Sequence, residues 1–525
     1  MARVLGTNFR ETEFVKPLKP IFCLAMATTQ HRGRRSFRFN HGFSLVTYCF
    51  LVHLLLASGI KKTNGSEVHN RRLGAPKSDS DNPICDYSYS QIAELIEGVK
   101  NRLVSRGFTV RDGRMHVGDS QSFASNPGNP YYSYFLDEEI PFNPNFKLNA
   151  TSAVLFVGCT PSDAKYFSFR SYAFKANSRM VFASLGDSMN HLVINTTQSG
   201  PTWARTSSGA VENPHGKLTA VVTTADGITL KKVATSLKEA GVPQGIVNLD
   251  AIPSDRVDLF NDTSLELMFL HRANSWTNED RKKHYFDLIR RVLVIDAPPG
   301  QDFSPIPEIP LREQGTGKHE TEQPGVASDL AKLHDAVVSS MELASYKLVK
   351  SKTMTDKNVD GFECLEKRIN CKGDNRDANY LELRNYQPFK KKDIYWFVGT
   401  NYAATGKTVY TSIGLYQLIV NRSEKDQLLS TNITVDDSSM ENSASAFGIE
   451  NNKLIAYAMA RKCNKVPKGI RKYCVEVGYD PDREIPSKSY WGLATRTYLE
   501  PETKTAPLVS EIVMPQFLKF QPLEN

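Results

Sequence analysis

Residues 217–249 read KLTAVVTTADGITLKKVATSLKEAGVPQGIVNL and are the stretch that says most about the fold. A strand-like run at 217–224 is followed by an Asp-Gly pair and then by apolar residues at helical spacing, Leu230, Val233, Ala234 and Leu237. A Gly-Val-Pro stretch at 241–243 ends the helix, and residues 245–249 supply a second strand. This β-α-β pattern predicts a sheet with at least one helix packed on it.

The flanking sequence predicts a mixed body in two domains. Strand-like and helical runs alternate up to residue 298, whereas residues 326–525 begin with an amphipathic helix and are mostly strand-like beyond it. Prolines and glycines are dense in residues 299–325, which we interpret as a linker or as a strap across the surface. A chain of 525 residues is also too long for one ordinary core. We therefore expect an α/β or α+β fold, with a β-α-β-containing domain at 84–298 and a β-rich domain at 326–525.

An uncharged hydrophobic segment, Phe43–Ile60, precedes the body and has about the length of one bilayer crossing. Residues 1–42 form a basic cytosolic tail or a long targeting region, and residues 61–83 form a polar linker. If Met1 is the start, the segment is a transmembrane signal anchor. If Met26 is the start, it is the hydrophobic region of a cleaved signal peptide. Either way the sequence predicts a single-pass membrane protein with an extracellular or luminal body, or a secreted protein.

The net charge of +8 lies entirely in residues 1–62, which carry ten basic and two acidic residues. The remainder balances at 55 basic against 55 acidic residues. Nucleic-acid binding needs an excess of basic residues to neutralise phosphates, so we expect no nucleic-acid partner. If residues 43–60 are not cleaved, the membrane is the partner that the sequence indicates.

Six cysteines follow the hydrophobic segment, at positions Cys85, Cys159, Cys364, Cys371, Cys463 and Cys474. An even number of cysteines beyond a translocation signal predicts three disulfides in an oxidising compartment. Fifteen pairings exist, and the sequence alone does not choose among them. Short loops favour Cys364–Cys371 and Cys463–Cys474, which leaves Cys85 with Cys159. A zinc site is the competing interpretation, but no Cys-x-x-Cys is present.

Six Asn-x-Ser/Thr triplets lie on the same side of the hydrophobic segment as these cysteines. Each is a candidate N-glycosylation site, and together they support a secretory route. The asparagines are Asn64, Asn149, Asn195, Asn261, Asn421 and Asn432.

The strand-like run ending at Leu185 continues as Gly186-Asp187-Ser188, with Asn190 two residues further on. This L-G-D-S-x-N stretch resembles the nucleophile block of the SGNH (GDSL-type) hydrolases. The resemblance covers about ten residues and implies an extracellular serine hydrolase that uses Ser188. The family's Asp-x-x-His near the C-terminus is missing here, because no histidine follows His334. The alternative is an ordinary Gly-Asp-Ser turn between two strands.

Two further motifs suggest ion or phosphate binding. Asp374, Asn375 and Asp377 offer hard oxygen ligands for calcium, although the alternate-acid spacing of an EF-hand is absent. Gly406-Lys407-Thr408 looks like the end of a phosphate loop, but the upstream glycine is two residues too far away for a Walker A motif. We interpret it as a turn between strands. No motif calls for a cofactor.

The run Tyr166 to Phe174 alternates aromatic with polar or small residues. In a regular strand Tyr166, Ser168, Arg170 and Tyr172 share one face, which predicts either core packing or a surface for a carbohydrate or small-molecule ligand. Because no complete catalytic set is visible, we expect a glycoprotein ectodomain with a binding or structural role, and a Ser188 hydrolase as the alternative.

Overall fold

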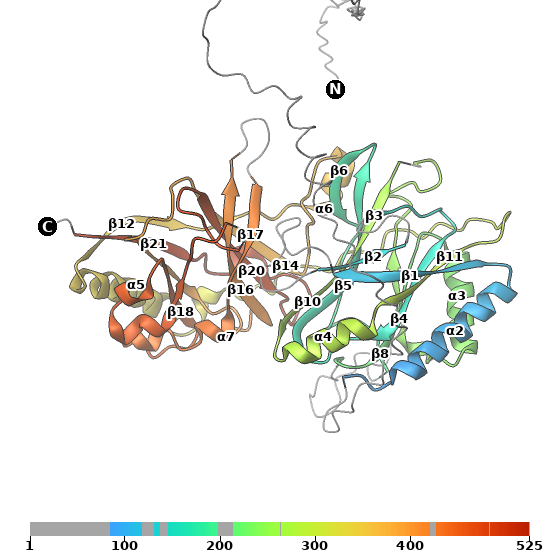
Figure 1. Ribbon diagram of the computed structural model, residues 1–525, viewed down its shortest axis with the longest axis horizontal. Helices are drawn as coiled ribbons and strands as arrows, with labels where there is room; N and C mark the ends of the chain where they lie inside the picture. Colours follow the sequence, from blue (N-terminus) through green and yellow to red (C-terminus); the bar gives the residue numbers. More distant parts are fainter. Residues whose placement is uncertain are drawn as a thin grey trace, which may run out of the picture. The chain divides into compact units, whose positions relative to one another are not determined.

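The computed structural model describes residues 84–117, 131–136, 145–197, 214–262, 264–420, 427–481 and 483–523, all within the contact unit Asp79–Asn525. The hydrophobic segment Phe43–Ile60 and two of the triplets, at Asn64 and Asn421, lie outside these ranges. No helix in the described ranges is long and apolar enough to cross a membrane. The fold is mixed α+β and rich in strands (Figure 1).

The first sheet has eleven strands in the order β6-β5-β10-β2-β1-β11-β4-β8-β9, with β3 paired to β10 and β7 paired to β5. Its strands are β1 (Thr109–Val117), β2 (Tyr132–Phe135), β3 (Asn145–Phe146), β4 (Ala153–Cys159), β5 (Ala164–Ala176), β6 (Arg179–Ser184), β7 (Met189–Asn190), β8 (Leu218–Thr224), β9 (Val247–Ala251), β10 (Glu266–Trp276) and β11 (Arg291–Asp296). Among the described strands of this first sheet, only β8 and β9 pair in parallel, and helix α3 (Gly227–Glu239) connects them. This confirms the β-α-β unit. The antiparallel remainder identifies the class as α+β rather than α/β.

The first sheet curls so that strands far apart in its order meet. Asp250 in β9 accepts hydrogen bonds from the backbone and the hydroxyl of Ser171 in β5, and it pairs with Arg170 at 3.1 Å. One face of the curled sheet encloses an aromatic-rich core around Phe156, Phe169 and Phe269. On the other face, α2 (Tyr89–Ser105) and α3 lie side by side and cover β4 and β8 (Figure 1).

The C-terminal half is a sandwich of two five-stranded sheets. The first has the order β12-β21-β15-β18-β19 and the second the order β13-β14-β20-β16-β17. Their strands are β12 (Tyr346–Thr353), β13 (Thr355–Asp356), β14 (Ala378–Asn385), β15 (Ile394–Thr400), β16 (Tyr410–Ile419), β17 (Gln427–Asp436), β18 (Leu454–Ala460), β19 (Cys474–Glu476), β20 (Tyr490–Tyr498) and β21 (Gln516–Pro522). Apolar side chains of both sheets, among them Trp491 and Phe397, form the core between them.

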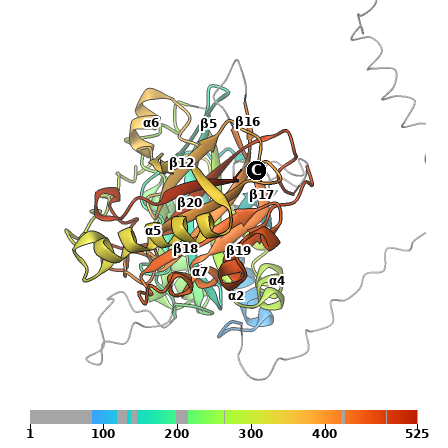
Figure 2. The same ribbon diagram turned by 90° about the vertical axis from the view of Figure 1, so that its left-hand side faces the viewer.

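Helix α5 (Val326–Leu343) covers the outer face of the β12–β19 sheet with Val326, Leu333, Val337 and Met341 (Figure 2). These positions are seven, four and four residues apart, which places them on one face of the helix, as the amphipathic pattern predicts. The remaining helices are α4 (Glu279–Leu288), α6 (Gly361–Lys367) and α7 (Asp437–Met440), with short 3-10 turns at Gln244–Ile246, Glu320–Glu322, Ala444–Phe447, Cys463–Lys465, Lys468–Tyr473 and Val509–Glu511.

The proline-rich segment 299–325 touches both halves of the structure. Near its start, the backbone N–H of Ile306 donates to Ala225 beside the β8 end of the first sheet. Further on, the backbone N–H groups of Thr316 and Gly317 donate to Glu511 of the sandwich, at 3.0 and 2.6 Å. The segment therefore packs along the protein over much of its length.

An Asp-Gly pair between strand-like runs is typical of a hairpin turn, and residues 111–114, Arg-Asp-Gly-Arg, contain such a pair. In the structure these residues lie inside β1 instead, where Gly113 pairs with Val292 of β11. A β-carbon at Gly113 would lie 3.0 Å from the Val292 side chain and 3.3 Å from the Phe135 carbonyl oxygen. Glycine is therefore used here for close packing between strands rather than for a turn.

Candidate functional site

Several residues that the sequence analysis singled out separately meet where the first sheet packs against the sandwich. We call this set the polar junction. It comprises Tyr166, Ser184, Asp187, Ser188 and Asn190 from the first sheet, Asp374 to Asp377 from the segment before β14, and Arg312 from the proline-rich segment. Segments up to about 200 residues apart in sequence thus form one hydrogen-bonded layer, buried except for the half-buried Asp187, Arg312 and Arg376.

The Gly-Asp-Ser turn after β6 is held by two arginines. Asp187 pairs with Arg376 at 2.8 Å and accepts a hydrogen bond from the backbone N–H of Arg312. The Arg312 guanidinium also donates to the carbonyl oxygen of Ser188 at 3.0 Å. Gly186 has φ +129°, and a β-carbon there would approach the Arg170 guanidinium to 3.0 Å. Glycine is thus required both by the backbone conformation and by the close approach.

Ser188 is 2% exposed, and its hydroxyl donates to the side-chain oxygen of Asn375 at 3.1 Å. An amide oxygen does not accept the proton that a serine nucleophile must lose. No histidine among the described residues forms a hydrogen bond with this hydroxyl. Ser188 therefore belongs to the buried hydrogen bonds that link the first sheet to the segment before β14. The geometry does not favour the hydrolase hypothesis.

Asp374 and Asp377 accept hydrogen bonds from protein donors. The backbone and hydroxyl of Ser184 donate to Asp374 at 2.7 and 2.5 Å, while Tyr166 and Asn190 donate to Asp377 at 2.8 and 2.9 Å. Burial raises the pKa of each carboxyl to about 6, against the opposing effect of these donors. Both aspartates are thus poised to change protonation near neutral pH.

The calcium prediction at Asp374, Asn375 and Asp377 gains no geometric support from these contacts. Asn375 also accepts from the Asp377 backbone at 3.1 Å, so each of the three side chains joins a different part of the junction. Elsewhere in the described ranges, the one group of acidic, histidine or cysteine side chains close enough to hold an ion is Cys85, Asp86 and Cys159. Its two cysteines form a disulfide, which removes both thiolates as ligands.

The aromatic strand β5 places Tyr166, Ser168, Arg170 and Tyr172 on one fully buried face. That face meets β14 and β20 of the sandwich, with the rings of Tyr166 and Tyr498 4.5 Å apart. Beside it, Arg272 of β10 lies over Tyr131 and Tyr172, and Arg496 of β20 lies over Tyr380 and Tyr416. Cation–π contacts of this kind stabilise buried guanidinium groups. This buried face of β5 therefore packs in the protein interior and does not offer a surface to a ligand.

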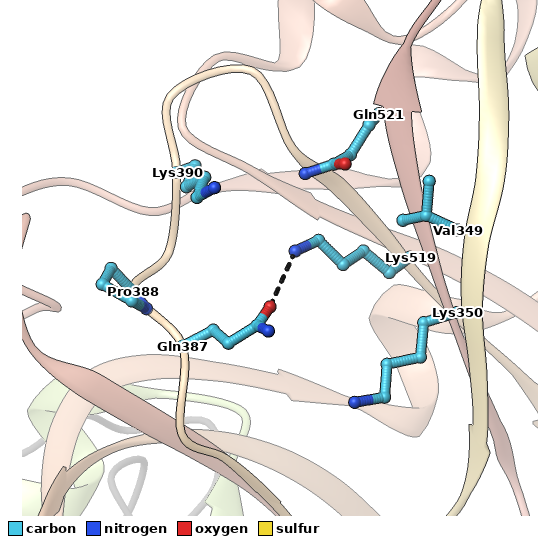
Figure 3. A pocket seen from close by; sticks show the side chains of 7 residues that line it. All are labelled: Val349, Lys350, Gln387, Pro388, Lys390, Lys519 and Gln521. Atoms are coloured by element: carbon cyan, nitrogen blue, oxygen red, sulfur yellow. Dashed lines mark hydrogen bonds between the residues drawn. The ribbon is translucent and has the colours of Figure 1, made fainter.

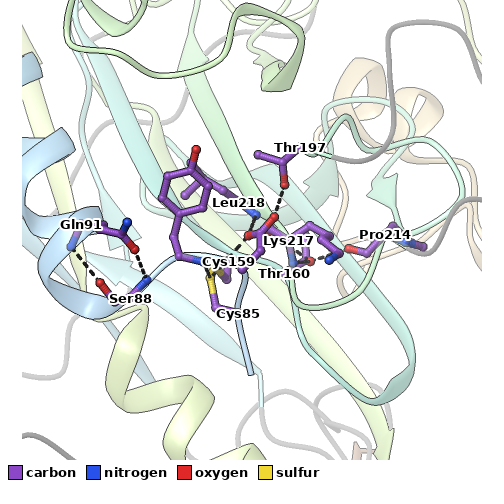
Figure 4. The surroundings of a disulfide bond; sticks show 11 residues. Cys85, Ser88, Gln91, Cys159, Thr160, Thr197, Pro214, Lys217 and Leu218 are labelled. Atoms are coloured by element: carbon purple, nitrogen blue, oxygen red, sulfur yellow. Dashed lines mark hydrogen bonds between the residues drawn. A yellow bond between two sulfur atoms is a disulfide. The ribbon is translucent and has the colours of Figure 1, made fainter. Parts of the chain in front are cut away.

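The structure holds three disulfides, Cys85–Cys159, Cys364–Cys371 and Cys463–Cys474. The first ties the segment before α2 to the end of β4 (Figure 4). Next to it, Asp86 accepts from the backbone of Leu218 at 2.9 Å and from the hydroxyl of Thr197. The second closes the α6 region, where Cys371 donates its backbone N–H to Val181 of β6. The disulfide framework therefore supports both the first sheet and the polar junction.

Lys407, the lysine of the phosphate-loop-like motif, is part of a buried ion cluster. It is 4% exposed and donates to Glu500 at 2.9 Å and to Glu511 at 2.6 Å. Burial works to raise the pKa of Glu511, but the donors Lys407, Thr316 and Gly317 outweigh it and lower the pKa to about 2. The ammonium group is committed to these carboxylates, which agrees with the interpretation of residues 406–408 as a turn.

Four candidate glycosylation asparagines lie in the described ranges. Asn149, Asn261 and Asn432 are exposed, whereas Asn195 is half-buried. The backbone of Asn195 is bound on both sides by the side chain of Asn248, which donates to its carbonyl oxygen and accepts from its N–H. The first three asparagines are therefore more accessible than Asn195.

Two grooves follow one another along β12, and the sequence analysis did not identify them. The first has a volume of about 470 Å³ and is lined by Val349, Lys350, Gln387, Pro388, Lys390, Lys519 and Gln521 (Figure 3). The second has a volume of about 330 Å³ and is lined by Lys352, Thr353, Thr355, Lys357, Glu382, Leu383 and Arg384. Lysines from distant segments meet in the first groove, and Lys352 and Lys357 lie near Arg384 in the second. A total charge count does not reveal either grouping.

No family model and no curated protein matches the sequence. Among solved structures, the N-terminal CBM22-1-CBM22-2 tandem domain of Xyn10C from Paenibacillus barcinonensis aligns at 9% identity over 79% of this chain and 92% of that chain, with a TM-score of 0.13. A TM-score this low identifies neither a shared fold nor a shared ligand.

Proposed function

We propose that the protein is a secretory-pathway glycoprotein whose body, residues 84–523, is a disulfide-stabilised ectodomain that acts by binding. The carrying observation is that all six cysteines beyond the hydrophobic segment are paired in three disulfides. Disulfides persist in oxidising compartments and are rare in the cytosol. Under this proposal Phe43–Ile60 directs the body across a membrane, either as an anchor or as a cleaved signal.

The exposed positions of Asn149, Asn261 and Asn432 support the same route, because an accessible asparagine is required for glycan attachment. Binding is favoured over catalysis because the Ser188 hydroxyl is buried against an amide and Asp374 and Asp377 are occupied by protein donors. The two grooves along β12, in contrast, are lined by several lysine side chains.

Expression of the full chain in a eukaryotic secretory host tests the proposal. We expect the protein in the medium or on the cell surface, a mobility increase after N-glycosidase treatment, and no free thiol in the body before reduction. Replacement of Asn149, Asn261 or Asn432 by Gln should in each case reduce the glycosidase shift, and Asn195→Gln should reduce it less. A glycosidase-insensitive protein with reactive thiols that stays in the cytosol would refute the proposal.

The hydrolase alternative has its own test. A serine-reactive phosphonate applied to the secreted protein should leave Ser188 unlabelled, because the hydroxyl is buried and lacks a base. An adduct mapped to Ser188 that disappears in Ser188→Ala would establish the hydrolase instead.

We also propose that residues 84–298 and 326–525 are two domains joined by the strap 299–325. The separate sheets and cores of the two halves support this division, while the polar junction and the strap tie them together. Limited proteolysis should cut first outside the two sheet systems. Release of a fragment ending within either sheet system would count against these boundaries.

A further inference from the structure

We propose that the β12 side of the sandwich binds a linear acidic polysaccharide, with Lys350, Lys352 and Lys390 contacting its carboxylate or sulfate groups. The proposal rests on the extracellular placement proposed above, because such polymers are found outside cells and in the secretory pathway. It assigns a ligand class to the two grooves along β12.

This surface carries an excess of positive charge. We define the basic face as residues 346–357, 382–393 and 516–522, which form β12, β13, the end of β14 with the loop after it, and β21. These residues include nine lysines and arginines against three acids, a net charge of +6. The body as a whole is neutral, so the basic face is a strong local excess. Such a concentration of one sign attracts polyanions.

Two of the three acids within the basic face form ion pairs there, whereas the third, Asp356, is exposed and accepts a hydrogen bond from the backbone of Asn358. Asp393 pairs with Lys519 at 2.9 Å with both side chains buried, and Glu382 pairs with Arg384 at 3.1 Å. None of the ion pairs in the described part of the chain involves Lys350, Lys352 or Lys390. Burial lowers the pKa of Lys352, and the charge of Lys350 adds to this effect. An anion bound between these ammonium groups would relieve their mutual repulsion.

The arrangement of the lysines fits an extended chain. Lys350 lines the first groove, and Lys352 and Lys357 line the second. Lys350 and Lys352 lie on β12, at the edge of its sheet, and Lys357 directly follows β13. At about 3.3 Å per residue, the run from Lys350 to Lys357 covers roughly 20 Å. Lys390 lines the first groove from the loop after β14 (Figure 3). A linear polymer can contact all four lysines, whereas a small anion can contact only one or two.

The other groups at the grooves favour a sugar polymer over a nucleic acid. Gln387 and Gln521 line the first groove, and their amides can bond to hydroxyl groups, with Gln387 already accepting from Lys519 at 3.3 Å (Figure 3). Tyr386, next to Gln387, is 50% exposed and offers an apolar ring to the C–H face of a sugar. Arginine forks recognise phosphates best, but Arg384 is the only arginine in the basic face and it is engaged by Glu382.

The test uses the full-length secreted protein and surfaces carrying heparin, hyaluronan, dextran or a short DNA duplex. We expect binding to heparin, to hyaluronan or to both, no binding to dextran, and an affinity that falls as salt is added. The triple variant Lys350→Ser, Lys352→Ser, Lys390→Ser should lose about tenfold or more in affinity. Heparin alone would indicate that sulfates are required, and equal binding of both would indicate that carboxylates suffice.

The matched control removes three exposed lysines outside the basic face, with Lys318→Ser, Lys332→Ser and Lys462→Ser. Its affinity should stay within about twofold of the wild type, since charge lost at a distance is screened. If the first triple variant is poorly secreted, the double variant Lys350→Ser, Lys390→Ser replaces it, because these two residues are exposed whereas Lys352 is half-buried.

Equal losses in both triple variants, binding to dextran, or tighter binding to DNA than to either acidic polysaccharide would overturn the inference. A protein that is secreted and glycosylated but binds neither acidic polysaccharide refutes this inference alone. A protein that never enters the secretory pathway refutes the proposed function.

Discussion

The buried cluster of Lys407, Glu500 and Glu511 predicts a large loss of stability when the lysine is removed. Lys407→Met keeps much of the apolar stem but leaves two carboxylates, 3% and 4% exposed, without their cation. Breaking a buried pair from one side costs about 3–5 kcal/mol. The pKa of Glu511 gives a similar figure, since a drop from 4.5 to about 2 corresponds to about 3 kcal/mol of stability at neutral pH.

The pH dependence follows from the direction of that shift. A carboxyl whose folded-state pKa is depressed contributes stability above its unfolded pKa, and that stability is lost as the pH falls toward about 2. In Lys407→Met the unpaired carboxylates can take up protons instead. The difference in unfolding free energy between wild type and variant should therefore be largest near pH 7 and shrink toward pH 4.

Urea denaturation followed by tryptophan fluorescence measures this difference, because Trp396 and Trp491 are fully buried in the sandwich. Lys332→Met, at a side chain 65% exposed, is the control and should change the free energy by less than about 0.5 kcal/mol. Adding Glu500→Gln and Glu511→Gln to Lys407→Met should recover part of the loss by removing the buried charge. A loss no greater than in Lys332→Met, or a loss that does not depend on pH, would refute the reasoning.

Two more predictions concern the junction and the disulfides. Asp374→Asn imitates the protonated carboxyl. Because burial raises the pKa of Asp374 to about 6, the wild type should lose about 2 kcal/mol of stability relative to the variant between pH 4.5 and 7.5. Parallel profiles of stability against pH for the two proteins would contradict this. Removing Cys85–Cys159, which spans 74 residues, should destabilise the protein more than removing Cys463–Cys474, which spans 11. The expected losses in thermal or urea unfolding are about 4 and about 3 kcal/mol. The reverse order would show that loop length does not govern the effect.

The sequence by itself determined the local features of this protein. The β-α-β unit at 217–249 was predictable because hydrophobic spacing and a Gly-Val-Pro stop act within a few residues of each other. The α5 helix and the short-loop disulfides Cys364–Cys371 and Cys463–Cys474 were predictable for the same reason. The hydrophobic segment Phe43–Ile60 and the position of the excess charge likewise depend only on neighbouring residues.

The tertiary structure alone decided what the singled-out residues do. Ser188, Asp377 and Tyr166 suggested three unrelated sites in the sequence, yet they meet in one buried junction, because strand pairing brings together segments about 200 residues apart. Lys407 changed from a phosphate-loop candidate to a buried ion-pair partner through contacts with residues 93 and 104 positions away. The sequence did not predict the basic face, because charges that balance along the chain can still separate in space. The lysines are gathered on one surface only when β12 packs near β21 and β14.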